Sequence, residues 1–269
     1  HARGVDLAAV DHAGTPGWVG DRDEGEARTA LRGAEMSALQ EKLYADGRRG
    51  GSRALLLVLQ GLDTAGKGGI VRHVVGMVDP QGVALRSFGV PTAQERAEHY
   101  LWRIRNALPR PGYLGVFDRS HYEDVLVVRV EGLVAPDVWQ ARYEEINDFE
   151  AEVVAAGTTI VKVALAVSEQ EQARRLRERL ERPDKHWKYN PGDLDVRAKR
   201  PAYLEAYQAV LDRTSTPVAP WYVVPADRKW FARLAVTELV THALEAMDLT
   251  WPPAQFDVAA ELARLDASG

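Results

Sequence analysis

The chain has no cysteine among its 269 residues. Without cysteine, neither a disulfide framework nor a thiolate metal site is available. No stretch approaches the roughly 18 apolar residues of a membrane-spanning helix, and the first residues lack the pattern of a signal peptide. The sequence begins with His1 rather than Met, so we expect that its natural start has been trimmed or altered. Together these absences favour a cytoplasmic protein that does not contact a membrane.

An excess of positive charge is also absent. The formal net charge of −5 argues against general affinity for nucleic acids. A polyanionic ligand would have to be held by a local group of basic side chains. The hydrophobic content of 46% and the charged content of 27% are ordinary for globular proteins, and the length suits one large α/β domain.

The most informative segment is an apolar run followed by a glycine-rich loop. Residues 55–59 are Leu-Leu-Leu-Val-Leu, and residues 61–67 read Gly-Leu-Asp-Thr-Ala-Gly-Lys, which is the pattern G-x-x-x-x-G-K. Such a loop surrounds phosphates with backbone N–H groups, and Lys67 and the positive end of a helix from about Gly68 add charge. The pattern alone also recurs by chance, but an expected strand before it and an expected helix after it favour a phosphate-binding loop.

This loop departs from the usual pattern at its magnesium ligand. The residue after Lys67 is Gly68, whereas a Ser or Thr hydroxyl normally binds Mg²⁺ there. An acidic residue, Asp63, lies inside the loop instead. A carboxylate among phosphates requires a cation between them, so we interpret Asp63 as a replacement metal ligand.

Alternation of apolar strands and helical patterns predicts the fold. Strands are expected at 55–59, 83–88, 113–117, 158–167 and 221–224, and helices at 34–45, 68–78, 91–108, 122–130, 136–155, 168–182, 192–213 and 227–247. The pattern predicts an α/β fold with three layers, a five-stranded, mostly parallel sheet between helices on both faces. Its ligands should lie at the carboxyl ends of the strands. We expect a surface arm at 1–33, partly disordered, a single domain at 34–249 and a tail at 250–269.

A second motif follows the expected strand 113–117. Asp118 stands at the end of that strand, where P-loop enzymes present a second acidic group to Mg²⁺ or to the attacking oxygen. Arg119 beside it can bind phosphate oxygens with two nitrogens. Alternatively, Asp118 only caps a helix that starts at Ser120. The phosphate loop in the same chain favours the functional interpretation.

Basic side chains gather between Arg174 and Arg200. A solvated helix face with ion pairs, such as Glu178 with Arg182, would account for several of them. The break at Pro183, with Lys185 and Lys188 on a loop beside aromatic residues, is instead typical of a helical lid at about 171–200 that folds over an anion and excludes water. In a chain of net negative charge, this segment indicates a highly charged substrate.

With these elements in view, the chain closely resembles the type 2 polyphosphate kinases, a family of phosphate-loop kinases. The resemblance implies the P-loop kinase three-layer α/β/α sandwich with a helical lid. The motifs that carry the resemblance are the loop 61–69, the motif 117–123, Arg179 with the segment 183–188, and the segments 214–217 and 219–227. They span about residues 34–247. The acidic residue in the first loop and the Asp-Arg-Ser sequence at 118–120 are the specific signals.

The resemblance implies reversible, Mg²⁺-dependent transfer of a phosphoryl group from inorganic polyphosphate to ADP, AMP or the guanine equivalents, with Mn²⁺ as a possible substitute. Transfer would be by direct in-line attack rather than through a phosphohistidine, and we expect His73 and His121 to be structural. A homotetramer or homodimer is also implied. The implied catalytic residues are Asp63, Asp118, Lys67 and Arg119, with Asp63 and Asp118 binding the metal. The implied phosphate and nucleotide ligands are Gly61, Thr64, Ala65, Gly66, Gly68, Glu123 and Arg129, and the implied lid residues are Arg179, Arg182, Lys185 and Lys188.

Within that family, the chain is most similar to the subgroup that phosphorylates both nucleoside mono- and diphosphates. Tyr122-Glu123 and the stretch 221–231 carry this similarity, and Glu123 would help to select the nucleotide. Alternatively, Glu123 only favours the dipole at a helix start. Two departures affect the lid: Arg182 adds a cation where relatives have an acid, and Arg200-Pro201-Ala202 replaces a Trp-Asp-Asp stretch.

Two other functions would fit part of the sequence. An ATP-dependent nucleoside monophosphate kinase, such as a thymidylate kinase, shares the sheet, the loop and an Asp-Arg motif. The acid at Asp63 and the missing hydroxyl after Lys67 argue against it. A non-catalytic protein that binds polyphosphate or nucleotides would not need both Asp63 and Asp118.

Overall fold

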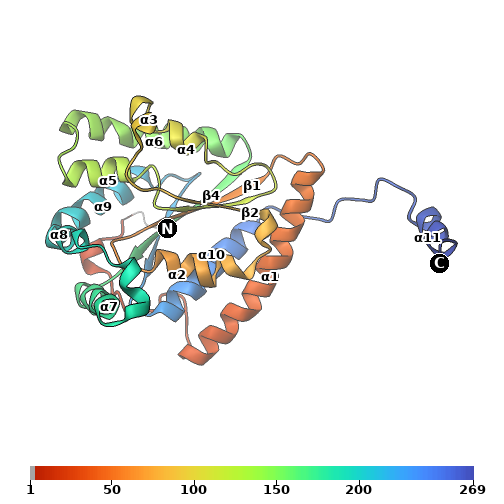
Figure 1. Cartoon of the computed structure of the whole chain (residues 1–269), viewed down its shortest axis with the longest axis horizontal. Coiled ribbons are helices and arrows are strands. Elements are labelled where there is room, and N and C mark those ends of the chain that lie inside the picture. The colour runs from red at the N-terminus through yellow and green to blue at the C-terminus, as the bar shows by residue number, and fades with distance from the viewer. Residues whose placement is uncertain (1–3) are drawn as a thin grey trace.

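One parallel sheet organises the chain in the computed structural model, which describes residues 4–269 (Figure 1). Within those residues the sheet has five strands in the order β2-β3-β1-β4-β5, and every pairing is parallel. The strands are β1 (Ala54–Gln60), β2 (Val83–Ser87), β3 (Leu114–Asp118), β4 (Thr158–Ala166) and β5 (Trp221–Pro225). The prediction of a five-stranded, mostly parallel sheet is confirmed.

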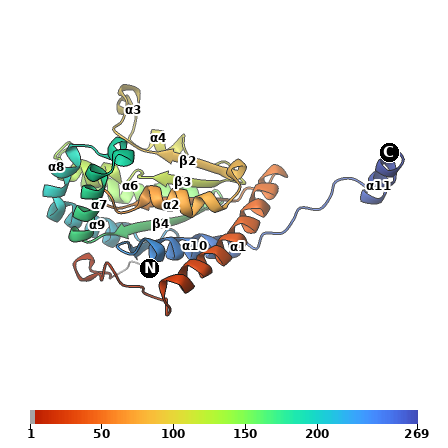
Figure 2. The same ribbon diagram turned by 60° about the horizontal axis from the view of Figure 1, so that its bottom comes forward.

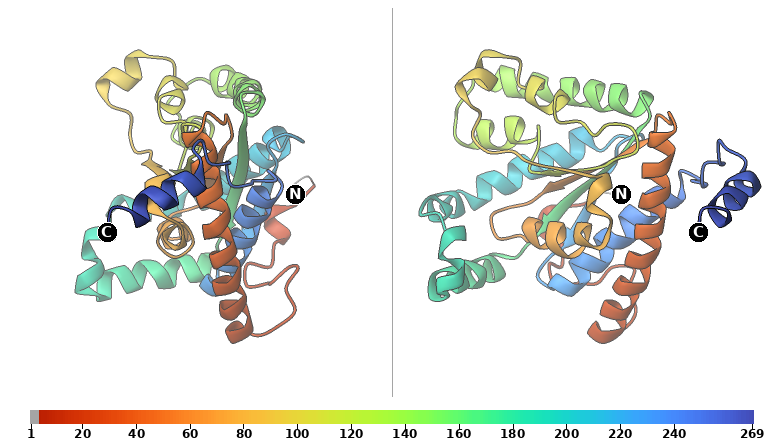
Figure 3. Two further views of the ribbon diagram at one scale, coloured as in Figure 1. Left: turned by 90° about the vertical axis from the view of Figure 1, so that its right-hand side faces the viewer. Right: turned by 45° about the vertical axis from the view of Figure 1, so that its right-hand side comes forward.

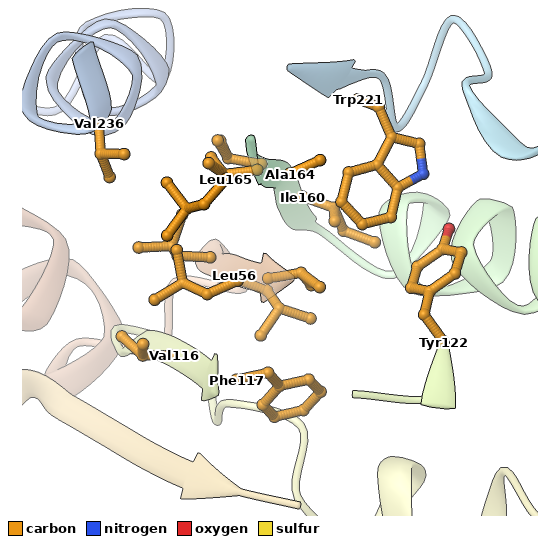
Figure 4. Packing of buried hydrophobic residues seen from close by; sticks show 14 of the residues in the cluster. Leu56, Val116, Phe117, Tyr122, Ile160, Ala164, Leu165, Trp221 and Val236 are labelled. Atoms are coloured by element: carbon orange, nitrogen blue, oxygen red, sulfur yellow. The ribbon is translucent and has the colours of Figure 1, made fainter. Parts of the chain in front are cut away.

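The core lies on both sides of the central strand. All seven residues of β1 are buried, as expected for a strand with a neighbour on each side and helices over both faces. Apolar side chains of the strands pack toward Val236 on one side and toward Trp221 and Tyr122 on the other (Figure 4). The rings of Tyr122 and Trp221 meet edge to face, with centroids 4.7 Å apart.

Two helical layers complete the sandwich (Figures 1 and 2). One layer contains α1 (Arg22–Arg48), α2 (Lys67–His73) and α10 (Lys229–Glu245), and the other contains α4 (Trp102–Arg105), α5 (Glu123–Val130), α6 (Pro136–Ala155) and α9 (Arg200–Thr214). The three-layer α/β/α architecture that the sequence predicts is therefore confirmed. None of the helices in residues 4–269 combines the length and the apolar character that crossing a bilayer requires.

The first long helix begins earlier than expected. We expected a helix over 34–45 after a surface arm, but α1 already begins at Arg22. A capping box explains this start, because Asp21 and Glu24 each accept a hydrogen bond from the other's backbone N–H. Upstream, Leu7 is buried in the core, so the described part of the expected arm packs on the domain. Residues 1–3 lie outside the described residues.

Three expected helices are shorter or interrupted. The helix expected over 91–108 is divided into α3 (Ala93–Ala97) and α4, because Glu98 adopts extended backbone angles. The helix expected over 68–78 ends at His73 and is followed by 3₁₀ turns at Val75–Met77 and Pro80–Gly82. The helix expected over 192–213 is divided at Lys199 into α8 (Gly192–Ala198) and α9. A proline at the second position of α9 fits a new helix start.

The lid segment forms a hairpin at the carboxyl edge of the sheet. Helix α7 (Glu169–Glu181) leaves the end of β4, a 3₁₀ turn follows at Pro183–Lys188, and α8 returns toward α9. Figures 1 and 2 show α7 and α8 together at that edge, beside the start of α2. The helical lid expected at about 171–200 therefore corresponds to α7, the 3₁₀ turn and α8.

The last helix stands apart from the rest of the chain (Figure 3). It is α11 (Val258–Asp266), and every residue in it is exposed. The connector that leads to it is extended and contains Pro252 and Pro253, which favour extended backbone. It lies within the expected tail 250–269.

Candidate active site

A cleft of about 870 Å³ lies at the carboxyl ends of the strands. Its walls come from the loop between β1 and α2, the end of β3, the lid hairpin and the start of α10. Ligands of open parallel sheets bind at this edge, so the cleft is where the sequence predicted the site. Most of the residues expected to bind phosphate line it: Asp63, Thr64, Ala65, Gly66, Lys67, Gly68, Asp118 and Arg119.

The phosphate loop has the backbone that an anion cradle needs. Gly66 caps α2 with φ of +119° and ψ of 10°, a left-handed conformation that favours glycine. Gly61 also has a positive φ, of +153°, and a Cβ there would lie 2.8 Å from the carbonyl oxygen of Leu165. Thr64 adopts φ of +64° although it is β-branched, a strain typical of functional loops. The N–H groups at the start of α2 therefore face the cleft in a fixed arrangement.

Lys67 is held inside its own loop. Its Nζ donates a hydrogen bond to the carbonyl oxygen of Gly61 at 2.6 Å. Burial and the neighbouring Arg119 guanidinium lower the pKa of Lys67, against the opposing effect of Asp63 and Asp118. The ammonium is thus poorly compensated in this structure, and an anion in the cleft would supply the missing charge.

Asp63 and Asp118 approach the cleft from two adjacent strands. Asp118 is the last residue of β3 and pairs with Leu59 of β1, while Asp63 follows β1 in the phosphate loop. Arg119 joins the two segments, because its Nη2 lies 3.2 Å from Asp63 Oδ1 and its N–H donates to the Leu59 carbonyl. Burial lowers the pKa of Arg119, but Glu123 and Asp63 outweigh burial and raise it. The structure thus brings both carboxylates to one edge with a permanent cation beside them.

The alternative role of Asp118 as a helix cap does not agree with the structure. Helix α5 begins at Glu123, its N-cap is Tyr122, and no side chain makes a capping hydrogen bond there. Ser120 is buried and accepts a hydrogen bond from Gln60 at 3.1 Å. Asp118 instead lines the cleft.

Side chains behind the phosphate loop fix its shape. Arg175 of α7 is buried and donates to the carbonyl oxygens of Thr64 and Ala65 at 2.9 and 3.1 Å. Its other terminal nitrogen donates to the carbonyls of Ala226 and Asp227. Because these carbonyls are satisfied from behind, the loop's N–H groups remain directed at the cleft. The sequence gives no signal that distinguishes Arg175, since it is one arginine among many in a basic helix.

Of two residues expected to bind the nucleotide, Glu123 lies near the phosphate loop and Arg129 lies outside the cleft. Glu123, the first residue of α5, lies in the field of Arg119 and Lys67; burial raises its pKa and these two cations oppose that effect. Both interpretations of Glu123, as a site residue and as an acid at a helix start, are thus compatible with its position. Arg129 is not among the residues that line the cleft, and its guanidinium lies over the Trp139 ring, 4.8 Å from the centroid.

The lid contributes three of its four expected cations to the cleft. Arg179, Lys185 and Lys188 line it. Arg182 is exposed and instead pairs with Glu178 and Asp184, at 3.2 and 2.7 Å. The ion pair expected between Glu178 and Arg182 is therefore present, and the extra cation of this chain lies outside the cleft.

Further basic side chains of the cleft come from the helical layer that contains α2 and α10. Arg72 of α2 and Lys229 and Arg233 of α10 line it together with the lid residues. The lining holds nine lysines and arginines against four acids, which are Asp63, Asp118, Glu178 and Asp193. His73 is exposed and lines the cleft too, and its expected structural role stays a prediction. His121 is buried against Glu150 as expected, with Nε2 to Oε1 at 3.2 Å.

The acids of the cleft fit a magnesium ion that is shared with a substrate. No group of three or more His, Cys, Asp or Glu side chains in residues 4–269 could hold a metal on its own. Mg²⁺ is commonly bound by one or two carboxylates together with substrate phosphates and water. Asp63 and Asp118, beside a loop that cradles phosphate, supply that kind of donor set.

The sequence of this chain is similar to those of known proteins. The sequence profile described as Polyphosphate kinase 2 matches residues 20–252. The chain belongs to the polyphosphate kinase 2 family. A curated relative, the AMP/ADP-polyphosphate phosphotransferase of Meiothermus ruber, is 44% identical over 92% of this chain and 91% of its own length. The ADP-polyphosphate phosphotransferase of Rhodopseudomonas palustris is 39% identical over 81% and 78%.

The fold agrees with a solved member of the polyphosphate kinase 2 family. The crystal structure of polyphosphate kinase 2 from Arthrobacter aurescens superposes with a TM-score of 0.96 at 51% identity, over 98% of this chain and 93% of that one. The resemblance stated from the sequence is therefore confirmed, and with it the class of enzyme. The roles of individual residues, and the division into arm, domain and tail, stay predictions.

Proposed function

We propose that this polyphosphate kinase 2 transfers a phosphoryl group reversibly between inorganic polyphosphate and a purine nucleotide, with AMP and ADP as acceptors. The observation that supports this most is the cleft itself, which joins a phosphate loop and two carboxylates to basic side chains on both flanking walls. A single nucleoside phosphate would not need so many cations. The name of the Meiothermus ruber relative includes both AMP and ADP, which supports the broader acceptor range.

The two basic walls suit a long anion that passes the phosphate loop. Arg179, Lys185 and Lys188 belong to the lid, while Arg72, Lys229 and Arg233 belong to α2 and α10. A polyphosphate chain carries a charge on every unit, so it gains from cations placed in succession. Arg182 lies outside this cleft, and we propose that it is not required for chain binding.

The reacting groups would meet between the phosphate loop and the end of β3. Bound Mg²⁺ would neutralise phosphate charge, which otherwise opposes the approach of two anions. The backbone N–H groups at the start of α2 and Lys67 would hold the transferred group, and Arg119 would stabilise the charge that develops on its oxygens. Asp63 and Asp118 would hold the metal. In-line attack by the nucleotide's terminal phosphate then needs no covalent intermediate on the protein.

A direct assay tests this function. Purified protein with Mg²⁺ and long-chain polyphosphate is given AMP, ADP, GMP or GDP separately, and products are separated by chromatography. ATP from ADP, and ADP followed by ATP from AMP, are the expected products. No reaction with polyphosphate, but ADP formed from ATP and a monophosphate, would instead support the nucleoside monophosphate kinase.

Carboxamide variants separate an enzyme from a protein that only binds. Asp63→Asn and Asp118→Asn should each reduce kcat by several orders of magnitude, because the metal that screens the phosphates loses a ligand. Polyphosphate binding without metal should stay the same or become tighter, since a negative charge is removed. Asp184→Asn, on the exposed side of the lid, is the matched control and should keep its kcat. Wild-type turnover in Asp63→Asn and Asp118→Asn would contradict the assigned roles.

We further propose that two or more copies of the chain associate, and that a second copy covers α11. The apolar residues Val258, Leu262 and Leu265 are all more than half exposed and recur at the spacing of one helix face. A helix of 9 residues is marginal in water without a partner. A second copy is the partner that is always present at a matching concentration.

A further inference from the structure

The lid arginine expected to bind phosphate is already engaged by a carboxylate. Arg179 Nη1 of α7 lies 3.2 Å from Asp193 Oδ2 of α8, and it also donates to the carbonyl oxygen of Lys188 at 3.1 Å. Both side chains line the cleft. Their side chains are only 24% and 12% exposed, so water screens this pair less than an ordinary surface pair. Any phosphate that binds Arg179 fully must compete with this carboxylate.

The carboxylate of Asp193 occupies an unfavourable position for a negative charge. Burial and the nearby charge of Asp63 raise the pKa of Asp193, against Arg179 and Arg119, which lower it. An acid in a cleft built for polyanions would be expected to repel the substrate. Within residues 4–269, the ion pair of Asp193 is with Arg179, so the pair rather than the acid alone needs an explanation.

We propose that Asp193 acts as a placeholder for a substrate phosphate. Its carboxylate holds Arg179 in the cleft until a phosphate displaces it, and it takes Arg179 back when the phosphate leaves. Because the binding-competent lid is then only a fraction of the population, apparent affinity for polyphosphate is lowered by that fraction. This weakening speeds dissociation and prevents the basic cleft from trapping its own product. The proposal rests on the proposed function of the cleft. It adds that Asp193 determines how tightly the cleft binds polyphosphate.

The lid provides its own matched comparison. Arg182 and Asp184 form a second arginine–aspartate pair at 2.7 Å, but both lie outside the cleft and are at least half exposed. Asp184→Asn therefore changes the net charge of the lid by the same amount as Asp193→Asn without releasing a cation into the cleft. Asp184→Asn therefore controls for the loss of one lid charge, and the direct repulsion between a cleft carboxylate and phosphate is measured separately in a variant without Arg179.

Equilibrium binding tests the proposal without turnover. End-labelled inorganic polyphosphate is titrated against wild type, Asp193→Asn and Asp184→Asn in the absence of nucleotide, and dissociation is followed by dilution into unlabelled chain. Asp193→Asn should bind about three- to tenfold more tightly, with slower dissociation. Asp184→Asn should stay within about twofold of wild type.

The opposite sign would overturn the proposal. If Asp193 only clasps α7 to α8, its removal loosens the lid, so Asp193→Asn would bind as wild type does or more weakly. Asp193→Ser repeats the test if the asparagine variant folds poorly. In an Arg179→Met background, Asp193→Asn should raise affinity less than it does in wild type, because only direct repulsion is relieved and no arginine is left to release. A full effect there would also overturn the proposal.

The same experiments distinguish this proposal from the proposed function. If wild type binds polyphosphate but transfers nothing to any nucleotide, and Asp193→Asn still binds more tightly, the proposed function fails and the placeholder stands. If transfer occurs as expected but the affinity of Asp193→Asn does not rise, only the placeholder fails. If wild type does not bind polyphosphate at all, both fail.

Discussion

At the scale of single residues, the site combines groups whose charges depend on a ligand. Lys67 keeps its ammonium next to Arg119, and burial and that guanidinium lower its pKa. Asp63 is held by Arg119 at 3.2 Å. A bound phosphate would relieve the repulsion between the two cations and complete the shell of donors in the phosphate loop. The site without substrate is therefore electrostatically incomplete.

The pH dependence of activity should report the lowered pKa of Lys67. A base with a lowered pKa loses its proton at a lower pH. The pH profile of kcat/KM for polyphosphate should therefore have an alkaline limb, a decline that occurs at a pH below the ordinary lysine pKa of about 10.4. The limb in kcat should lie at higher pH, because bound phosphate stabilises the ammonium. In Lys67→Arg, which does not titrate in this range, residual activity should lack the limb. Persistence of the limb in that variant would assign it to another group.

Arg175 should matter for stability more than its place in a basic helix indicates. It donates to four backbone carbonyls of the phosphate loop and of the segment after β5. Arg175→Met leaves buried acceptors without partners, so the free energy of unfolding in urea should fall by about 2–4 kcal/mol. The exposed neighbour Arg174, which pairs with Glu171, gives the control Arg174→Met, with an expected change within about 0.5 kcal/mol. Equal effects of the two variants would contradict the bracing role.

At the scale of helices and strands, a buried ion pair joins β4 to α6 in the helical layer that also contains α5 and α9. Lys162 of β4 and Glu150 of α6 are fully buried and form a salt bridge. Tyr122 donates to Glu150 at 2.8 Å, and Lys162 donates to Tyr122 and to the carbonyl oxygen of Thr214, each at 2.8 Å. Because Tyr122 follows Asp118 and Arg119 closely in sequence, this network anchors the segment that leads from the site into α5.

Breaking this pair from one side should be costly. Glu150→Gln leaves the Lys162 ammonium buried without a counter-charge, so the free energy of unfolding should fall by about 3–5 kcal/mol. The double variant Glu150→Leu with Lys162→Met removes both charges and should recover a large part of that loss, although Tyr122 and Thr214 lose a partner. Urea unfolding followed by circular dichroism measures both. The single variants Glu150→Leu and Lys162→Met complete the cycle, and a double variant whose loss equals the sum of their losses would show that the charges are not coupled.

The sequence predicts elements better than it predicts the surfaces that they share. The strands and the phosphate loop are local patterns, and their positions agree with the structure. The start of α1 at Arg22 was missed because its first turns are mostly exposed and polar, although Asp21 and Glu24 carried a capping signal. Arg72 and Arg233 could not be assigned to the site, because helices far apart in sequence meet only after folding. Asp193 lies inside the predicted lid, but its pairing with Arg179 depends on how α8 folds back on α7.

At the scale of the whole molecule, one domain carries the site and α11 lies beyond it. Figure 3 shows this helix separated from the body by its connector. The superposition on the Arthrobacter aurescens enzyme includes 98% of this chain, so it leaves too few residues outside to exclude the whole tail.

Removal of residues 250–269 should change association and leave the fold intact. Since α11 buries none of its residues in its own chain, circular dichroism and the unfolding midpoint at low concentration should stay near the full-length values. The mass from sedimentation should fall toward that of a single chain, because the apolar face of α11 loses its partner. Leu262→Ser with Leu265→Ser should act in the same direction. An unchanged mass in both variants would exclude α11 from the interface.

The order of the strands also determines when the sheet can be completed. Leu57 of the central strand β1 pairs with Val116 on one side and with Val161 on the other. During synthesis, β1 therefore stays without its second neighbour until the ribosome has passed the middle of the chain. A run of aliphatic residues that waits with open edges can pair wrongly with other chains. We expect chaperones that shield nascent apolar segments to raise the yield of this protein more than its final stability would indicate.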